Sequence, residues 1–578
     1  MLSIRVCLGK FGWCIAALFL VAWLGGCESN TTPVSIAQAA AEAQEPAPDP
    51  NSVQLLFTYG SEKEEWIKDV TAAFNASQQK AGGKTIVVKA VPIGSGECIE
   101  EVIRGVRKPH LISPASAAFI QLGNAESKEK NGTALVGPTK NLVLSPVVIA
   151  MWKPMAEALG WGKKPVGWAD IRDIANAADG WAARGHADWG SFKFGHTHPD
   201  FSNSGLISIF AEIYAATGKS ENITPEDVRS PKTAQFLHDI EKSVLHYGSS
   251  TGFFGKKMFA NGPQFLSAAV LYENMVIESY GKDYQDKLPF PVVAVYPKEG
   301  TFWSDHPVGV VQRDWVTDEH KQAAKIYIDY LLTKEAQQKA MTYGFRPGLE
   351  SLTLTAPLDA EHGVDPREPK LVLDVPSVEV MQAARKAWQQ NKKHARVVLV
   401  FDRSGSMNSA GKLNNAKRGA RDIIAMLGDD DTLGLLPFSS TSAWVEKGVK
   451  MKDGRERMVS AVNGIFAEGE TALYDTIAQA YEFIQANPEP ELINAIIVLT
   501  DGEDNKSRLK LKELVGQVKI DNEKKNVRIY TIAYAADSRE ADIYDRILKL
   551  IADATQAKSY KGTPENIRAV FKDIATFF

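Results

Sequence analysis

The chain has 578 residues and a formal net charge of -4, with 44% hydrophobic and 24% charged residues. This is the composition of globular domains with sizeable cores, and it excludes a fully disordered chain, a collagen and a polytopic membrane protein. At roughly 100–200 residues per domain, the length indicates two to four domains. With a pI of about 6.3 the chain has no overall positive charge that would attract nucleic acid, and we find no basic patch with interleaved aromatic residues. No nucleic-acid partner is therefore expected.

The N-terminus has the pattern of an export signal. Arg5 and Lys10 precede an apolar run over residues 11–24, which is shorter than the ~20 residues of a membrane-spanning helix. The run ends in Leu24-Gly25-Gly26-Cys27, which resembles the lipobox of bacterial lipoproteins. This resemblance implies a signal peptide over residues 1–26, cleavage before Cys27 and a lipid such as palmitate on its thiol. An uncleaved anchor helix is the alternative.

Residues 27–51 are rich in Ala, Pro, Gln and Glu and have few large apolar side chains, so we expect a flexible tether. The rest of the chain would then hang from a membrane in the cell envelope, on the periplasmic side. Glu28 stands where the enterobacterial sorting rule places an aspartate for inner-membrane retention, which favours the outer membrane. Once the signal is removed and Cys27 is acylated, Cys98 is left alone and no intramolecular disulfide is possible.

From residue 52 onward, short apolar runs alternate with amphipathic stretches. Residues 54–59 and 85–91 predict strands, and residues 64–74 predict a helix with one apolar face. This alternation is typical of a parallel α/β sheet, in which ligands bind at the loops that follow the strands. Small hydroxyl and glycine residues fill several such loops, at 58–61, 94–96, 113–116 and 202–205. They favour a polar or anionic ligand at helix N-termini, although helix capping alone explains each loop taken singly.

Four segments, at 144–150, 194–206, 272–274 and 342–347, resemble the bacterial extracellular solute-binding proteins of the type II periplasmic class. The resemblance covers about residues 52–350. It implies two α/β lobes that close on a ligand, joined by crossovers near 141–152 and 289–311. Carried over by position, the side chains expected to line the cleft are Thr58, Ser61, Ser95, Ser116, Ser145, Ser204 and Tyr272.

The chemical class of the solute stays open at this point. Hydroxyl-rich loops favour an oxyanion, whereas the aromatic residues Tyr59, Phe302 and Trp303 would suit a sugar or a peptide. His196 and His198 could both face one way and ligate a metal, but a surface loop explains them more simply.

Residues 351–394 form a linker between two bodies, and their second half is predicted to be helical. The continuous apolar run over 396–401 then indicates a buried parallel strand, followed by an amphipathic helix. Further strands are predicted at 432–437, 495–500 and 527–534, and helices at 472–485, 509–518, 543–552 and 565–577. The pattern predicts a doubly wound, Rossmann-like α/β sheet with helices on both faces.

Oxygen-bearing side chains gather at the expected strand ends of this sheet. Asp402, Ser404 and Ser406 form a D-x-S-x-S set, Asp501 ends another buried strand, and Thr471 opens a helix. Two carboxylates and three hydroxyls suit a hard divalent ion such as Mg²⁺, or alternatively Ca²⁺ or Mn²⁺.

These five residues resemble the metal-ion-dependent adhesion site of von Willebrand factor A-type (VWA) domains, over about residues 395–578. The resemblance implies that Ser404, Ser406 and Thr471 ligate the metal directly or switch with state, and that the aspartates often act through water. The remaining coordination position would accept an acidic side chain from a partner protein. Glu470 departs from the pattern, because a second glycine is common there.

Taken together, the sequence predicts a membrane-anchored extracytoplasmic binding protein with a small solute between two lobes and a protein partner at the metal. A substrate-binding component of an ABC importer with an accessory VWA domain is the alternative. We expect no enzymatic activity, since no nucleophile–base pair, G-x-S-x-G, H-E-x-x-H or C-x-x-C motif is present.

Overall fold

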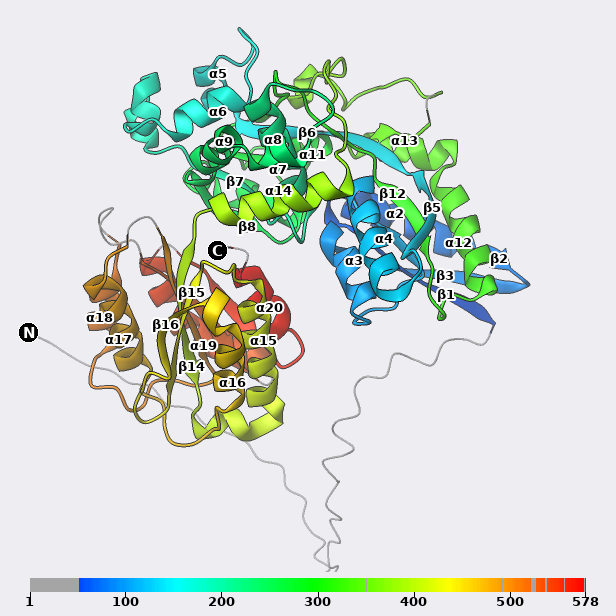
Figure 1. Ribbon diagram of the computed structural model, residues 1–578. Coiled ribbons are helices and arrows are strands. Elements are labelled where there is room, and N and C mark those ends of the chain that lie inside the picture. The colour runs from blue at the N-terminus through cyan, green and yellow to red at the C-terminus, as the bar shows by residue number, and fades with distance from the viewer. Residues whose placement is uncertain are drawn as a thin grey trace, which may run out of the picture. The chain divides into compact units, whose positions relative to one another are not determined.

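The computed structural model describes residues 51–349, 351–489, 492–520, 527–535, 538–555, 557–575 and 577. The expected signal peptide, the acylated Cys27 and the tether up to residue 50 lie outside these residues. Among the described residues, no helix combines the length and the apolar character needed to cross a membrane. The described chain begins with a two-lobed α/β region and ends with a separate α/β sheet (Figure 1).

The first lobe contains a six-stranded sheet in the order β2-β3-β1-β4-β12-β5. β1 pairs in parallel with β3 and β4, whereas β12 runs antiparallel to β4 and β5. The strands are β1 (Ser52–Gly60), β2 (Lys80–Ala81), β3 (Lys84–Ile93), β4 (Leu111–Ser113), β5 (Val136–Asn141) and β12 (Pro307–Val311). The helices are α2 (Glu64–Ala76), α3 (Ser95–Ile103), α4 (Ala117–Asn131), α12 (Asp318–Leu331) and α13 (Lys334–Thr342), with a short 3₁₀ turn, η1 (Ser61–Lys63), before α2. Trp66, Val70 and Phe74 form the buried face of α2, as their spacing predicts.

The second lobe contains a sheet in the order β10-β6-β9-β7-β8, with β11 and β13 also paired to β6. Its strands are β6 (Val143–Trp152), β7 (Phe194–Thr197), β8 (Val244–Gly248), β9 (Ala268–Tyr272), β10 (Val292–Val295), β11 (Trp303–Ser304) and β13 (Arg346–Pro347). Its helices are α5 (Lys153–Leu159), α6 (Trp168–Ala175), α7 (Asn203–Thr217), α8 (Pro225–Arg229), α9 (Pro231–Glu241), α10 (Thr251–Asn261) and α11 (Glu273–Glu278). Two 3₁₀ turns, η2 (Gly180–Arg184) and η3 (Ala187–Trp189), precede β7.

The chain crosses between the two lobes twice. β5 belongs to the first sheet and β6 to the second, with only Leu142 between them. The chain returns through β11, paired to β6, and β12, paired in the first sheet. Both crossovers lie within the segments that the resemblance implies, and this is the architecture expected of the periplasmic-binding-protein-like fold.

The segment after the second lobe folds back onto it. A 3₁₀ turn, η4 (Ala360–His362), precedes the predicted helix, which is α14 (Val378–Asn391). α14 packs against α7, α8 and α9, and Trp388 is fully buried in the hydrophobic core of the second lobe. In space, this helix is therefore part of that lobe.

The C-terminal region is a six-stranded sheet in the order β16-β15-β14-β17-β18-β19, in which every pair except β15–β16 is parallel. The strands are β14 (Ala395–Asp402), β15 (Thr432–Phe438), β16 (Glu446–Lys450), β17 (Ile493–Thr500), β18 (Val527–Tyr534) and β19 (Ser559–Gly562). A 3₁₀ segment, η5 (Gly405–Gly411), leads into α15 (Lys412–Met426), and α16 (Met451–Asn463), α17 (Leu473–Ala486), α18 (Leu511–Val518), α19 (Ser538–Ala554) and α20 (Ile567–Ala575) follow.

Helices cover both faces of this sheet, as the sequence predicts. α15, α16 and α20 share a hydrophobic core with one face, and α17, α18 and α19 share a second core with the other (Figure 1). The parallel strands all end at one edge, where the D-x-S-x-S loop follows β14 and Asp501 follows β17.

Candidate functional sites

Five helices begin at the place where the two lobes face each other. α3 and α4 come from the first lobe, and α7, α10 and α11 from the second; the residues immediately before them are Gly94, Ser116, Ser202, Ser250 and Tyr272. A helix N-terminus presents backbone N–H groups and the positive end of the helix dipole. We call the polar side chains at these starts and at the adjacent strand ends the interlobe cluster.

Hydrogen bonds within the interlobe cluster join one lobe to the other. The Ser116 hydroxyl donates to Asn203 Oδ1 over 2.6 Å. Ser61 Oγ forms a short contact with Ser250 Oγ and accepts the backbone N–H of Gly252 at 3.0 Å. These bonds connect the first lobe to the starts of α7 and α10, so the hydroxyls meet only when the lobes are closed.

Tyr272 lies at the centre of the second-lobe half of the cluster. Its hydroxyl accepts from Asn203 Nδ2 at 3.0 Å and lies 3.4 Å from Thr251 Oγ1, which also donates to Ser204 Oγ at 3.1 Å. Burial, followed by the charge of Glu62, raises the pKa of Tyr272 far above its usual range. The phenol is therefore a neutral hydrogen-bonding group.

The remaining predicted cleft residues are also buried. Ser95 Oγ accepts the backbone N–H of Ala115 at 2.9 Å, and Ser145 exchanges hydrogen bonds with Asn274. Thr58 lies inside β1, and its hydroxyl has no hydrogen-bond partner. The structure thus brings Ser61, Ser116, Ser204 and Tyr272 into the cross-lobe network, and places Ser95, Ser145 and Thr58 at its base or inside the strands.

Sequence reasoning missed several members of the interlobe cluster, namely Lys63, Asn203, Ser250, Thr251, Asn274 and His306. Lys63, Asn203 and Asn274 lie within two residues of a predicted cleft residue, whereas no predicted cleft residue or loop lies near Ser250, Thr251 or His306. Two of the three aromatic candidates, Tyr59 and Phe302, are 2% and 0% exposed and pack inside hydrophobic cores, so they offer no ring surface to a sugar. The third, Trp303, is half-buried, and the Arg346 guanidinium lies 5.1 Å from the centre of its ring.

The cluster includes one buried charged group. Lys63 Nζ lies 2.6 Å from Glu62 Oε1 and 3.1 Å from His306 Nδ1, which is also 3.3 Å from Glu62 Oε1. Burial opposes ionisation of Glu62, but Lys63 and His306 outweigh it and lower the pKa of Glu62 to about 2. Burial, followed by the charge of Lys63, lowers the pKa of His306 to about 4. The group is thus neutral overall, and Nε2 of His306 is buried without a hydrogen-bond partner.

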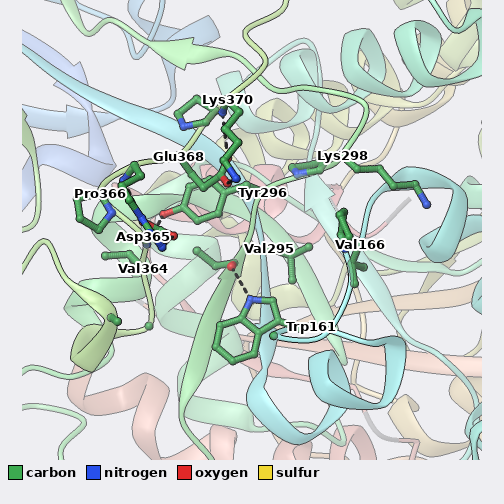
Figure 2. Close-up of a pocket in the computed structure, with 18 of the residues that line it drawn as sticks. Trp161, Val166, Val295, Tyr296, Lys298, Val364, Asp365, Pro366, Glu368 and Lys370 are labelled. Carbon is green, nitrogen blue, oxygen red and sulfur yellow. Dashed lines mark hydrogen bonds and ion pairs between the residues drawn. The ribbon is translucent and has the colours of Figure 1, made fainter.

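Two of the cavities in the solute-binding region differ in their lining residues. One, of about 780 Å³, includes Ser61 and Asn274 of the interlobe cluster and extends past Glu64, Glu278 and Lys256. The other, of about 710 Å³, is shown in Figure 2 and lies between β10 and residues 359–371 of the segment before α14. In that cavity Trp161 donates its indole N–H to the backbone of Ala294 at 3.1 Å. Its labelled side chains are largely apolar or paired, so it lacks the convergent hydroxyls of the first.

At the edge of the C-terminal sheet, the structure brings the five predicted metal ligands together. The Ser404 and Ser406 hydroxyls lie 2.9 Å apart, and Ser406 Oγ donates to Asp501 Oδ1 at 2.6 Å. Asp402 accepts the backbone N–H of Ser404 at 2.7 Å and the Thr500 hydroxyl at 2.5 Å. Thr471 belongs to the same edge, because a Cβ placed on Gly502 would lie 3.9 Å from its hydroxyl.

Hydrogen bonds donated by backbone N–H groups connect the D-x-S-x-S loop to the loop that precedes α17, and that loop to the one that follows β17. Gly405 N–H donates to the carbonyl of Gly469, and Thr471 N–H donates to Asn505 Oδ1, both at 2.9 Å. Burial raises the pKa of Asp402 to about 6, and the charge of Asp501 acts in the same direction. Such a carboxylate gains from a nearby cation.

A lysine adjoins this edge, which the sequence pattern did not identify. Lys412, the first residue of α15, places Nζ 3.0 Å from Asp501 Oδ2, and both side chains are buried. Asp501 thus keeps Oδ1 toward the serines while Oδ2 is held by the ammonium group. With two carboxylates and one lysine, the edge has a net negative charge before any cation binds.

The donor set fits a hard divalent cation. Adjacent oxygens of an octahedral Mg²⁺ site lie about 2.9 Å apart, because each Mg–O distance is about 2.0–2.1 Å. The contacts of Ser406 Oγ with Ser404 and Asp501, at 2.9 and 2.6 Å, are close to that spacing.

Comparison with known families matches both regions. The family model described as bacterial extracellular solute-binding protein matches residues 55–346, about half of the chain. This chain belongs to the bacterial extracellular solute-binding proteins. The model of the von Willebrand factor type A domain matches residues 397–570, so this solute-binding protein also has a VWA domain.

Solved structures resemble each region of this solute-binding protein. A periplasmic thiamin binding protein is 13% identical, with a TM-score of 0.42, over 59% of this chain and 96% of its own. The periplasmic binding protein AfuA from Actinobacillus pleuropneumoniae is 12% identical, with a TM-score of 0.39, over 58% and 98%. A von Willebrand factor type A protein from Catenulispora acidiphila is 21% identical, with a TM-score of 0.28, over 32% and 42%.

Among curated proteins, human calcium-activated chloride channel regulator 4 is 30% identical over 111 residues, which are 19% of this chain and 12% of that relative. The chain therefore spans only a small part of the length of this relative.

The prediction of a surface loop around His196 and His198 is wrong, because His196 lies in β7 and both side chains are buried.

Proposed function

We propose that this extracytoplasmic binding protein holds a small polar solute, rich in hydrogen-bond acceptors, in the interlobe cluster. Membership of the solute-binding family supports a small solute and an extracytoplasmic location. The observation that carries the finer proposal is the meeting of hydroxyls and helix N-termini from both lobes, with Ser116 and Asn203 bonded across the cleft. Closure would then be favoured by contacts that only the closed lobes provide.

Unpartnered polar atoms support a solute rich in oxygen atoms. His306 Nε2 and the hydroxyl of Ser113 are buried without a hydrogen-bond partner. A buried polar atom without a partner costs about 1–3 kcal/mol, so an oxygen-rich solute would gain by reaching these groups. Because Tyr59 and Phe302 are core residues and the Arg346 guanidinium lies over the ring of Trp303, an oxyanion or a small hydroxylated anion suits the cluster better than a ring stacked on an aromatic platform.

Native mass spectrometry of the purified full chain tests this proposal. We expect a small oxygen-rich molecule to co-purify with the wild type and to be lost from Tyr272→Phe and Ser116→Ala. Ser77→Ala is the matched control, because Ser77 donates to the Phe74 carbonyl at the end of α2, away from the cleft. Co-purification of an organic cation, or full retention in both cleft variants, would contradict the proposal.

At the VWA edge, we propose that Asp402, Ser404, Ser406, Thr471 and Asp501 hold Mg²⁺ or a related divalent ion. Such an ion would supply positive charge with an open coordination position, to which an acidic side chain of a protein partner could bind. The hydrogen-bonded oxygens and the raised pKa of Asp402 support this assignment. Partner capture that is unchanged both by chelation and by Asp402→Ala would rule it out.

We also propose that the mature chain is anchored by a lipid on Cys27. The support is the sequence pattern of residues 1–27. Metabolic labelling with a palmitate analogue should label the wild type and leave Cys27→Ser unlabelled, whereas equal labelling would refute the anchor.

A further inference from the structure

A second group of metal-ligating side chains is buried in the second lobe, away from both sites described above. It comprises His196 from β7, Glu212 from α7 and Glu241 from the end of α9. One ligand atom from each residue lies within 4.8 Å of the others, and all three side chains are 0% exposed. We call these three residues the lobe-2 triad.

The imidazole of His196 has a defined orientation. Its Nδ1 lies 2.8 Å from the Thr197 carbonyl oxygen, which only accepts, so Nδ1 has the proton. Its Nε2 faces Glu241 Oε1 at 3.0 Å. An imidazole fixed by an Nδ1–H bond to a carbonyl, with Nε2 directed at carboxylates, is oriented as metal-binding histidines usually are.

Neighbouring donors hold the two carboxylates but leave one oxygen over. Glu241 accepts the indole N–H of Trp388 at 2.8 Å on Oε1 and the Tyr247 hydroxyl at 2.6 Å on Oε2. Glu212 accepts the Ser208 hydroxyl at 2.8 Å on Oε1, while its Oε2 is buried without any partner. Most buried polar atoms have a partner, so this oxygen requires an explanation.

The charge of the triad also calls for a cation. Among the described residues, His196 is the only basic side chain paired with either carboxylate, and the surroundings are hydrophobic core. Two buried carboxylates need either a shared proton or a positive ion, and a divalent ion with a neutral imidazole balances both charges.

We propose that the lobe-2 triad binds a divalent transition-metal ion, Zn²⁺ above all, through His196 Nε2, Glu241 and the unpartnered Oε2 of Glu212. One imidazole with two carboxylates suits Zn²⁺, whereas Mg²⁺ and Ca²⁺ prefer oxygen ligands throughout. Tetrahedral ligands at 2.0–2.1 Å lie about 3.4 Å apart. His196 Nε2 and Glu241 Oε1 lie 3.0 Å apart, which is closer than that spacing, and the ligand atoms of all three residues lie within 4.8 Å of one another, so side-chain shifts would bring them around one ion.

The ion would act as a structural clamp of the second lobe. It ties β7, α7 and α9 together, and through Trp388 it also fixes α14. Because the site has no exposed atom, the metal would be acquired during folding and would exchange slowly afterwards. This site is independent of the interlobe cluster and of the VWA edge.

The test is the metal content of the full chain refolded from denaturant with Zn²⁺ present and then dialysed against a chelator. We expect about one zinc per chain in the wild type, in Asp402→Ala, which lacks a VWA ligand, and in Glu299→Gln, a control carboxylate that accepts backbone N–H groups of α6. Glu212→Gln keeps the side-chain shape and the Ser208 bond and should hold less than a tenth of an equivalent.

X-ray absorption at the zinc edge keeps the proposal testable if Glu212→Gln does not fold. The wild-type spectrum should show one imidazole with oxygen ligands. Wild-type protein without zinc, equal zinc in Glu212→Gln, or a spectrum without imidazole would overturn the proposal, and the first result would mean that Glu212 and Glu241 share a proton instead.

Discussion

The interlobe cluster and the VWA edge use the same kinds of oxygen atoms but are assembled in opposite ways. At the VWA edge, Asp402, Ser404 and Ser406 lie on one loop, so their proximity follows from local geometry. In the interlobe cluster, the Ser61–Ser250 contact joins residues 189 positions apart and the Ser116–Asn203 bond joins residues 87 apart. Asp501 is 95 positions from Ser406 but follows the neighbouring strand of the same sheet, so the VWA edge forms within one sheet, whereas the interlobe cluster requires two lobes to meet.

The charges of the two sites differ as well. Glu62, Lys63 and His306 leave the interlobe group neutral, whereas Asp402, Asp501 and Lys412 leave the VWA edge with one negative charge in excess. A neutral site rich in hydrogen-bonding groups suits a solute that is recognised by polar contacts. A negative site suits a cation.

Removing one member of a buried ion pair should have the largest effect, and only on the solute-binding region. Arg346 pairs with Glu273, which follows Tyr272, at 2.6 Å with both side chains buried. Arg346→Met should lower the free energy of unfolding of this region by about 3–5 kcal/mol, because Glu273 is left charged and buried. Chemical denaturation measures it. The control Lys339→Met breaks the exposed ion pair with Asp69 and should lower the free energy of unfolding by less than about 1 kcal/mol. Equal losses in the two variants would show that the buried Arg346–Glu273 pair does not stabilise this region more than a surface pair does.

At the VWA edge, removal of a charged ligand should weaken Mg²⁺ binding. Asp501→Ala removes a carboxylate that contacts Ser406, and we expect Mg²⁺ affinity to fall about 100-fold, close to 3 kcal/mol. Isothermal titration calorimetry measures the change. Glu470→Ala, an exposed acidic residue paired with Lys506, should leave the affinity within about twofold; a comparable loss there would mean that general negative charge, and not ligation, binds the ion.

Lowering the pH should destabilise the solute-binding region, which contains His306, and so distinguish it from the VWA domain. Its pKa of about 4 in the folded chain lies below the ordinary value of about 6.5, so below pH 6.5 the unfolded chain binds the extra proton. The stabilisation is complete above pH 6.5 and is lost as the pH falls toward 4, with about 2 kcal/mol gone at pH 5. Calorimetry at pH 7.5 and 5 should show a loss about 2 kcal/mol smaller in His306→Asn than in the wild type, because His110 and His198, whose pKa values are also lowered to about 4, remain in both. Identical pH dependence in both would exclude His306 as the cause.

The smallest expected effect concerns Lys412. Lys412→Met removes a positive charge beside Asp501 and should tighten Mg²⁺ binding about tenfold, because the lysine and the ion repel each other. Lys417→Met is the matched control on the same helix, where the ammonium group contacts the Asn463 carbonyl. Weaker Mg²⁺ binding in Lys412→Met would show that the lysine serves chiefly to orient Asp501.

The fold follows from the sequence wherever a pattern is long or repeated. The buried strands β14, β17 and β18 and the amphipathic helices α2 and α15 lie close to their predicted ranges. The short strands β16 and β19 were missed, because four or five residues at a sheet edge have too little hydrophobic alternation to distinguish them from a loop.

The same rule applies to the sites: residues in a recognisable local pattern could be predicted, and residues that meet only through tertiary contacts could not. The D-x-S-x-S loop, Thr471 and Asp501 could be identified because each ends a recognisable strand or opens a helix. Lys412 could not, since a lysine in the first turn of an amphipathic helix has the pattern of a surface residue. Asn203, Thr251 and His306 join the interlobe cluster only through tertiary contacts, and the lobe-2 triad comes from three elements whose periodicity places Glu212 in an apolar helix without indicating its partners.

The bonds across the cleft have one more consequence. Since Ser116 and Asn203, and Ser61 and Ser250, already satisfy one another, an entering solute substitutes for existing bonds instead of adding to an empty set. Its affinity is then a difference between two sets of hydrogen bonds, those that the cleft residues make with one another and those that they make with the solute.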